Sequence, residues 1–212
     1  MKRKLLFLSS FFLFISFLTA QPVSTFTWSG DGDGITWNNS TNWDCTGDDC
    51  VGRWPGDNGA ANQDFVEIKD KNAEIYLPAN VTDIIIVQLD LDQGTLNFPL
   101  GSRLDITGDL NTKNNGTINF EFPAPGSGTL GVGGDLDIKG DFFAGAGTLI
   151  INGTEEQDFR VTGAGETPSE NPPPAKQIDL HNLVIDTQGS LTVNAKIVIT
   201  GTMEFLDGVV FT

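Results

Sequence analysis

Two short words of alternating apolar and polar residues recur through the second half of the chain and constrain its fold more than any other feature. The first word is Gly-Thr or Gly-Ser, then an apolar residue, any residue and a second apolar residue, and it starts at Gly94, Gly116, Gly128, Gly147, Gly189 and Gly201. The second word, apolar-x-Ile-x-Gly, starts at Leu104, Leu136 and Ile197. Both words have the period of two that is typical of a strand, and glycine permits the turn into the next strand.

A single repeat of this kind is too weak to fold alone. A coil of about 20 residues that buries roughly six apolar side chains gains about 9 to 18 kcal/mol, whereas ordering its backbone costs about 1 to 2 kcal/mol per residue. Stacked coils bond to one another and bury the surfaces that a lone coil would expose. We therefore predict an all-β fold, a parallel β-solenoid of the right-handed β-helix type, with a β-sandwich of repeated hairpins as the alternative. The expected inward-facing residues are Leu96, Phe98, Leu104, Ile106, Ile118, Phe120, Leu136, Ile138, Leu149, Ile151, Leu183, Ile185, Leu191, Val193, Ile197 and Ile199.

The beginning of the chain reads as an export signal. Residues 1–20 combine the basic start Lys2-Arg3-Lys4 with an apolar run that is too short to cross a bilayer, followed by small residues at the expected cleavage site, Thr19-Ala20. This pattern predicts a signal peptide and a protein that is secreted or held at the cell surface. No later segment is apolar enough to span a membrane, so we expect no membrane span in the mature chain.

The rest of the chain divides in two by composition. Residues 21–83 are rich in Trp, Gly and Asp and form the expected N-terminal capping module, and residues 84–212 carry the repeats. A proline-rich loop at 154–177 interrupts the repeats, because proline removes hydrogen-bond donors from a β-ladder. The final word, Gly208-Val-Val-Phe-Thr212, would leave an apolar rung uncovered. We expect the repeats to continue in a larger protein, or a partner to cover them.

Charge excludes one class of partner. The chain has 12 Lys and Arg against 28 Asp and Glu, for a formal net charge of −16. Nucleic-acid recognition requires clustered basic residues, and no such cluster follows Lys4. We therefore expect no nucleic-acid partner.

The N-terminal module carries the most distinctive motif of the chain. Its order is W-x-G, then W, then N-W, then P-G-x-x-D before a strand, and the residues that fit it are Trp28, Trp37, Asn42, Trp43, Pro55, Gly56 and Phe65. The stretch resembles the start of exported β-repeat proteins of Gram-negative bacteria, including autotransporter-associated β-strand repeat proteins and surface proteins of the type IX secretion route. The resemblance implies an adhesin or passenger scaffold rather than an enzyme.

The tryptophans of this module allow two interpretations. Trp28, Trp37, Trp43 and Trp54 supply a large apolar area that could cover the first coil, since tryptophan is usually mostly buried. Alternatively, they form an aromatic platform for sugar rings. We treat all four as candidate carbohydrate-binding residues.

Cysteine and aspartate give two further predictions in the same module. Cys45 and Cys50 are the only cysteines, and in an exported chain they favour a local disulfide over a metal site, since the chain has a single His. Loop carboxylates offer oxygen ligands for calcium, which is the one candidate cofactor. Solvated loop residues are the alternative for these carboxylates, which are those of Asp31, Asp33, Asp48 and Asp49.

Function follows from the repeats and the resemblance. We hypothesise an exported, non-catalytic structural or adhesin-like protein that contacts polysaccharide or another cell surface and forms the N-terminal part of a larger protein. The alternatives are a carbohydrate-binding module and a polysaccharide lyase or hydrolase built on a β-helix. A lyase needs a basic residue, and the candidates are Lys113, Lys139, Arg160 and Lys196.

Overall fold

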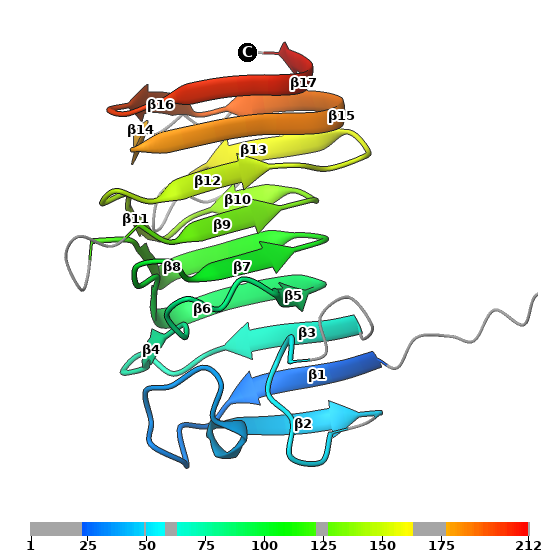
Figure 1. The fold of residues 1–212 in the computed structure, drawn as a ribbon, viewed down its shortest axis with the longest axis vertical. Helices are drawn as coiled ribbons and strands as arrows, with labels where there is room; N and C mark the ends of the chain where they lie inside the picture. Colours follow the sequence, from blue (N-terminus) through cyan, green and yellow to red (C-terminus); the bar gives the residue numbers. More distant parts are fainter. Residues whose placement is uncertain (1–22, 49, 58–62, 122–126, 163–176, 212) are drawn as a thin grey trace, which may run out of the picture.

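The chain winds as a parallel β-solenoid (Figure 1). The computed structural model describes residues 23–48, 50–57, 63–121, 127–162 and 177–211. Each coil passes through three strand positions. Equivalent strands of successive coils pair side by side in parallel, so the stack has three faces. We call these faces A, C and B, in the order in which the chain passes through them in each coil. The predicted solenoid is therefore confirmed. The antiparallel pairing that a sandwich requires occurs, among the described strands, only between β1 and β2.

Face A begins each coil. Its strands are β1 (Val23–Trp28), β3 (Gln63–Ile68), the first part of β6 (Gln88–Asn97), the first part of β8 (Leu110–Asn119), β10 (Leu136–Ile138), β13 (Gln157–Val161), the second part of β15 (Asn182–Asn194) and the end of β17 (Met203–Phe211). The long strands β6 and β8 bend from face A into face C, which makes a continuous ladder around that corner.

Faces C and B complete each coil. Face C contains β4 (Glu74–Tyr76), the second parts of β6 and β8, and β11 (Asp141–Phe143), followed by the pair β14 (Gln177–Leu180) and β16 (Lys196–Ile199), of which β14 contacts β11. Face B contains β5 (Ile84–Ile86), β7 (Arg103–Ile106), β9 (Thr129–Val132), β12 (Thr148–Ile151) and the first parts of β15 and β17.

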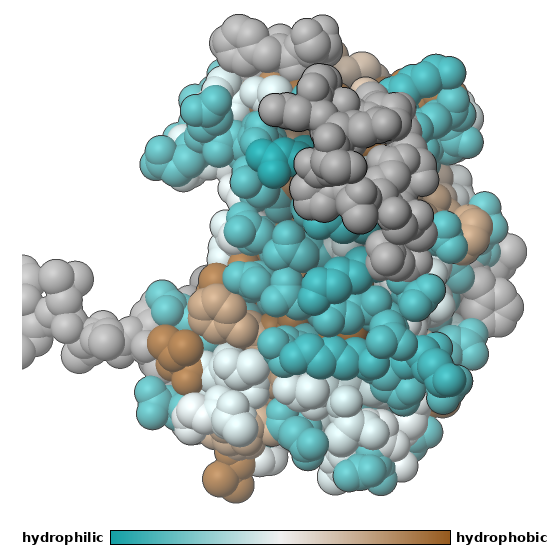
Figure 2. All heavy atoms as spheres, turned by 180° about the vertical axis from the view of Figure 1, so that it is seen from behind, coloured by the Kyte–Doolittle hydropathy of each residue, from teal (hydrophilic) through white to brown (hydrophobic). Residues whose placement is uncertain are grey.

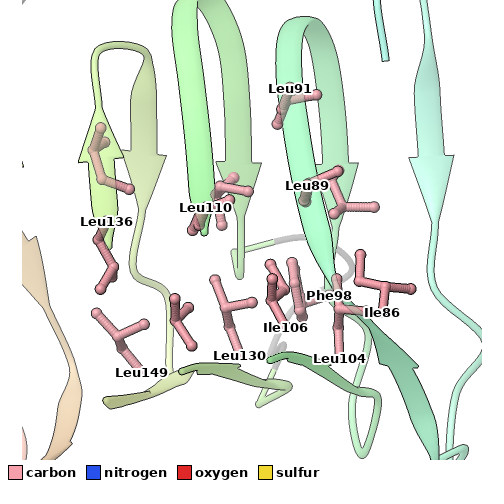
Figure 3. Close-up of a cluster of buried hydrophobic side chains, with 14 of the residues drawn as sticks. Ile86, Leu89, Leu91, Phe98, Leu104, Ile106, Leu110, Leu130, Leu136 and Leu149 are labelled. Atoms are coloured by element: carbon pink, nitrogen blue, oxygen red, sulfur yellow. The ribbon is translucent and has the colours of Figure 1, made fainter. Parts of the chain in front are cut away.

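The core consists of columns of apolar side chains that run along the stack. Leu104, Leu130 and Leu149 occupy equivalent positions in β7, β9 and β12, and all three are buried (Figure 3). Aromatic rings form a second column, in which Phe98 stacks on Phe120 with the ring centroids 4.4 Å apart. Every predicted inward-facing residue is buried except Val193, Ile197 and Ile199, which are half-buried near the C-terminal end.

Glycine in the recurring words serves close approach between coils as well as turning. Gly94 has a φ of 82°, which favours glycine, and it pairs with Gly116 of the next coil. Gly116 has no positive φ, but a Cβ added there would lie 2.1 Å from the carbonyl oxygen of Leu91. A Cβ added at Gly140, one coil further, would lie 1.8 Å from the carbonyl oxygen of Gly116. Any larger residue at this corner would force the coils apart.

The predicted boundaries map onto the stack as follows. β3 and β4 precede residue 84, yet both pair in parallel with β6, so the stacking is continuous across the boundary placed there. Within the predicted loop 154–177, Gln157–Val161 forms strand β13 and Gln177 begins β14. The proline-rich centre, 163–176, and the predicted signal peptide, 1–20, lie outside the described residues.

We predict that Leu130→Ala lowers the free energy of unfolding by about 2 to 5 kcal/mol, because it opens a cavity between neighbouring coils. Leu100→Ala is the matched control, since Leu100 is 59% exposed, and it should change the free energy by about 0.5 kcal/mol or less. Chemical denaturation of both variants measures the difference. Equal effects would contradict the assignment of the column.

Candidate functional sites

The Trp-rich cap closes the N-terminal end of the stack. β2 (Trp43–Gly47) pairs antiparallel with β1 and covers its outer edge, after a short 3₁₀ turn, η1 (Ser40–Asn42). The ring of Trp43 packs edge-on against Trp28 and against Trp37, with centroids 4.9 Å apart in both pairs. Trp43 Nε1 donates to the carbonyl oxygen of Trp37 at 2.7 Å, and Trp37 Nε1 donates to that of Pro55 at 2.9 Å. Both indole N–H groups are therefore satisfied inside the protein.

Burial decides how the tryptophans can be used. Trp28, Trp37 and Trp43 are at most 6% exposed, and Trp54 is half-buried against the core. A platform for sugar stacking needs an open ring face, which a buried indole does not offer. The structure thus places three of the four candidate carbohydrate-binding residues in the covering layer of the first coil, as the capping interpretation requires.

Asn42 organises the loop between β1 and β2. Its side chain is fully buried, and Oδ1 accepts hydrogen bonds from the backbone N–H groups of Gly32 and Gly34, both at 3.0 Å. Nδ2 donates to Asp33 Oδ1 at 2.7 Å and to the carbonyl oxygen of Thr36 at 2.9 Å. The asparagine of the N-W motif is therefore a structural hub, a role that the sequence analysis did not assign. The sequence feature that could have indicated this role is the position of Asn42 directly before Trp43 in the motif.

Asp33 is an anchor for the same loop. Its Oδ1 accepts from the N–H of Ile35 at 3.1 Å and of Thr36 at 2.9 Å, while Oδ2 accepts from the Thr36 hydroxyl. These donors favour the charged form and lower the pKa of Asp33 from 3.8 to about 2, the Asn42 amide being the largest cause.

The predicted calcium ligands do not converge in the described part of the chain. Asp31 and Asp48 are exposed, Asp33 binds the protein's own donors, and Asp49 lies outside the described residues. No group of three or more His, Cys, Asp or Glu side chains that could hold a metal ion occurs among the residues that the structure describes. The predicted disulfide between Cys45 and Cys50 is confirmed, and it closes the loop that follows β2.

A buried ion pair fixes the segment before β3 and was not predicted. Arg53 donates to Asp64 Oδ2 at 2.8 Å and to Asp57 Oδ1 at 2.9 Å, and the backbone N–H of Gly56 also donates to Asp64 Oδ2 at 2.8 Å. Arg53 is 6% exposed and Asp64 fully buried. Burial raises the pKa of the Asp64 carboxyl, against the opposing effects of the Gly56 amide and Arg53. Removing either partner of such a pair leaves an uncompensated buried charge.

Face A presents a polar outer surface. Figure 2 shows the side of the molecule that faces away from the viewer in Figure 1, where β10 and β13 lie behind β9 and β12. Hydrophilic side chains gather across the middle of this side. One column of outward-facing side chains takes a single residue from each successive coil. Its members are Glu67, Asp90, Asn111, Asp137, Arg160 and Asn194. Asn111 Nδ2 donates to Asp90 Oδ1 at 2.9 Å, which links two coils on the outside.

Three of the four candidate lyase bases lie on this side of the molecule, each beside an acid. Lys113 pairs with Asp92 at 2.7 Å and Lys139 with Asp137 at 2.5 Å. Arg160 pairs with Asp158, which raises the pKa of its guanidinium. Lys196, the fourth candidate, is exposed in β16 on face C. Each of the three basic side chains on this side is therefore paired with a carboxylate, and none of these three stands apart as an unpaired base.

Comparison with protein-family models, curated proteins and solved structures gives no match for this chain. Across the ranges that the structure covers, no helix is long and apolar enough to cross a membrane.

We predict that Asn42→Asp destabilises the cap by about 1 to 3 kcal/mol, because it removes the donor to Asp33 and sets two carboxylates against each other. Denaturation followed by tryptophan fluorescence measures the loss, since three buried tryptophans report on the cap. Asn38→Asp is the control for added charge, because Asn38 is exposed. An Asn42→Asp variant as stable as this control would show that the hub is dispensable.

Asp33 should make the stability of the cap depend on acid. Because its folded pKa is about 2 and its ordinary value 3.8, the unfolded chain takes up the proton first as the pH falls. Stability from this group is thus complete above about pH 4 and is lost toward about pH 2. The difference in denaturation midpoint between the parent and Asp33→Asn should be constant at neutral pH and shrink over this window. A difference independent of pH down to about 2 would refute the assignment.

Proposed function

We propose that this chain is an exported, non-catalytic protein of the cell surface with a structural or adhesin-like function. We propose further that it forms the N-terminal part of a larger protein. Three features support the proposal: the predicted signal peptide, the resemblance of the cap to surface β-repeat proteins, and the stacked coils, which form an elongated body. A scaffold of this kind displays regular outer surfaces while the stack supplies stability.

One observation carries the proposal. The buried polar side chains form hydrogen bonds and ion pairs with the backbone and with neighbouring segments. These bonds hold the stack together. Asn42 ties the cap loop, Arg53 and Asp64 tie the segment before β3, and Asn97 donates to the carbonyl oxygen of Ile75 at 3.3 Å. Gln157 Nε2 likewise donates to the carbonyl oxygen of Gly134 at 2.6 Å. Groups engaged in this way serve a structural purpose.

Face A is the surface that fits a polysaccharide best. Its outward column of carboxylates, amides and a guanidinium repeats once per coil, and such groups can bond to sugar hydroxyls along an extended chain. This observation favours contact with polysaccharide over contact through the buried tryptophans. A polysaccharide lyase or hydrolase remains the second candidate on the same face, since three candidate bases lie there.

Retention of soluble polysaccharides on beads that carry the folded protein tests both functions. We expect binding without cleavage, and we expect Asn111→Ala/Asp137→Ala, two neighbours in the face A column, to weaken retention about tenfold, or about 1.4 kcal/mol. Thr129→Ala/Thr148→Ala is the control, a matched outward pair on face B. Equal retention by the two double variants would rule out face A. New chain ends in the polysaccharide would establish the enzyme instead.

A further inference from the structure

The fold gathers lysines that are scattered along the sequence. Every lysine in the part of the chain that the structure describes lies at the corner where face A turns into face C. These lysines occupy the segments between β3 and β4 and between β10 and β11, the bend of β8, and the start of β16. We call this corner the lysine ridge, and its members are Lys69, Lys71, Lys113, Lys139 and Lys196. The winding of the chain therefore brings together basic groups that lie far apart in the sequence.

Four members of the lysine ridge form one column along the stack. β8 and β10 pair in register, which places Lys113 beside Lys139 of the next coil. The pairing of the other face A strands places Lys69 two coils before Lys113, and Lys196 two coils after Lys139. Paired strands lie about 4.8 Å apart, so the column runs for roughly 24 Å over five steps from coil to coil. The ridge is therefore a line of positive charge parallel to the stack.

The lysines of the ridge are more exposed than the carboxylates beside them. The side chain of Lys113 is 61% exposed and that of its partner Asp92 only 18%. Lys69 is 53% exposed against 32% for Glu67, and Lys139 likewise exceeds the aspartate with which it pairs. Exposed ion pairs of this kind contribute little to stability, and an ammonium group has three donors. Each lysine can therefore bond to an outside anion at little cost.

We propose that the lysine ridge binds an anionic polysaccharide, whose chain lies along the stack with its acidic groups against the ammonium groups. The inference rests on the proposed contact with polysaccharide and adds the charge class of the ligand, since the ridge borders face A. The rest of the surface restricts the path of such a ligand. The chain carries a formal net charge of −16, so a polyanion is repelled away from the ridge.

Charge spacing favours a polysaccharide over a nucleic acid. Double-stranded DNA carries one charge per roughly 1.7 Å of its axis, which is far denser than one lysine for every coil or two. Asp70, Asp92 and Asp141 share the corner with the lysines, and they would repel a polymer of that density. An acidic polysaccharide carries at most a few charges per sugar, and its hydroxyl groups can bond to the amides and carboxylates of face A. The mixed chemistry of the corner therefore fits a sugar acid better than a phosphate backbone.

Binding of polygalacturonate to the immobilised full chain tests the charge class. The fully methyl-esterified polymer is the matched neutral probe, because it keeps the sugar backbone and lacks the carboxylates. We expect the acid to bind at least about tenfold more tightly, with an advantage that shrinks between about 0.02 M and about 0.2 M salt because ions screen exposed charges. Equal binding of the two polymers would overturn the inference and leave the proposed contact with polysaccharide intact. Binding of neither polymer would contradict both.

Variants of the protein locate the site. Lys113→Gln should weaken binding of polygalacturonate about threefold, and Lys113→Gln/Lys139→Gln about tenfold, whereas Lys113→Arg should preserve it because the charge remains. Arg103→Gln is the matched control, since Arg103 lies on face B and also pairs with a carboxylate, that of Asp105. Circular dichroism checks that all variants are folded. The inference would be overturned if Arg103→Gln weakened binding as much as Lys113→Gln, or if single-stranded DNA at equal charge displaced the polysaccharide.

Discussion

Parallel pairing between successive coils is the interaction on which the whole structure depends. A coil buries too few side chains to offset the conformational entropy of its backbone, and the neighbouring coil supplies both the missing hydrogen bonds and the missing apolar contacts. The column of Leu104, Leu130 and Leu149 shows how this works, since Leu130 lies between the other two and all three are buried. The close approach also explains Gly116 and Gly140, where a Cβ would meet a backbone carbonyl of the preceding coil.

A stack held together in this way has two ends, and this chain treats them differently. At the N-terminal end the strand direction reverses, and β2, three tryptophans and the Asn42 hub cover the first coil. At the C-terminal end the last described strands keep the parallel direction and leave Met203 and Phe205 exposed. The two ends of the described stack therefore differ in strand direction and in how far their apolar side chains are covered.

Polar residues divide between two tasks along the same body. Inside the cap and between coils they satisfy backbone groups, as Asn42, Gln157 and the Arg53–Asp64 pair do. On face A they point outward in a column with one residue per coil, made of carboxylates, amides and one guanidinium, and basic side chains beside the column pair with some of the carboxylates. This division suits a surface scaffold, because stability and contact with the surroundings draw on different residues.

The fold class, most of the core and the disulfide could be predicted from the residues alone. Period-two words separated by glycine specify strands whose alternate residues point inward, and this is a local property that needs no coordinates. Cys45 and Cys50 are the only cysteines, and the predicted export favoured a bond between them over a metal site. The roles of Asn42, Arg53 and Asp64 became clear only in three dimensions, because their bonds join loop residues that follow no repeating pattern in the sequence. The exposure of Val193, Ile197 and Ile199 was also hidden, since their pattern matches that of the buried columns and only their place in the last coils distinguishes them.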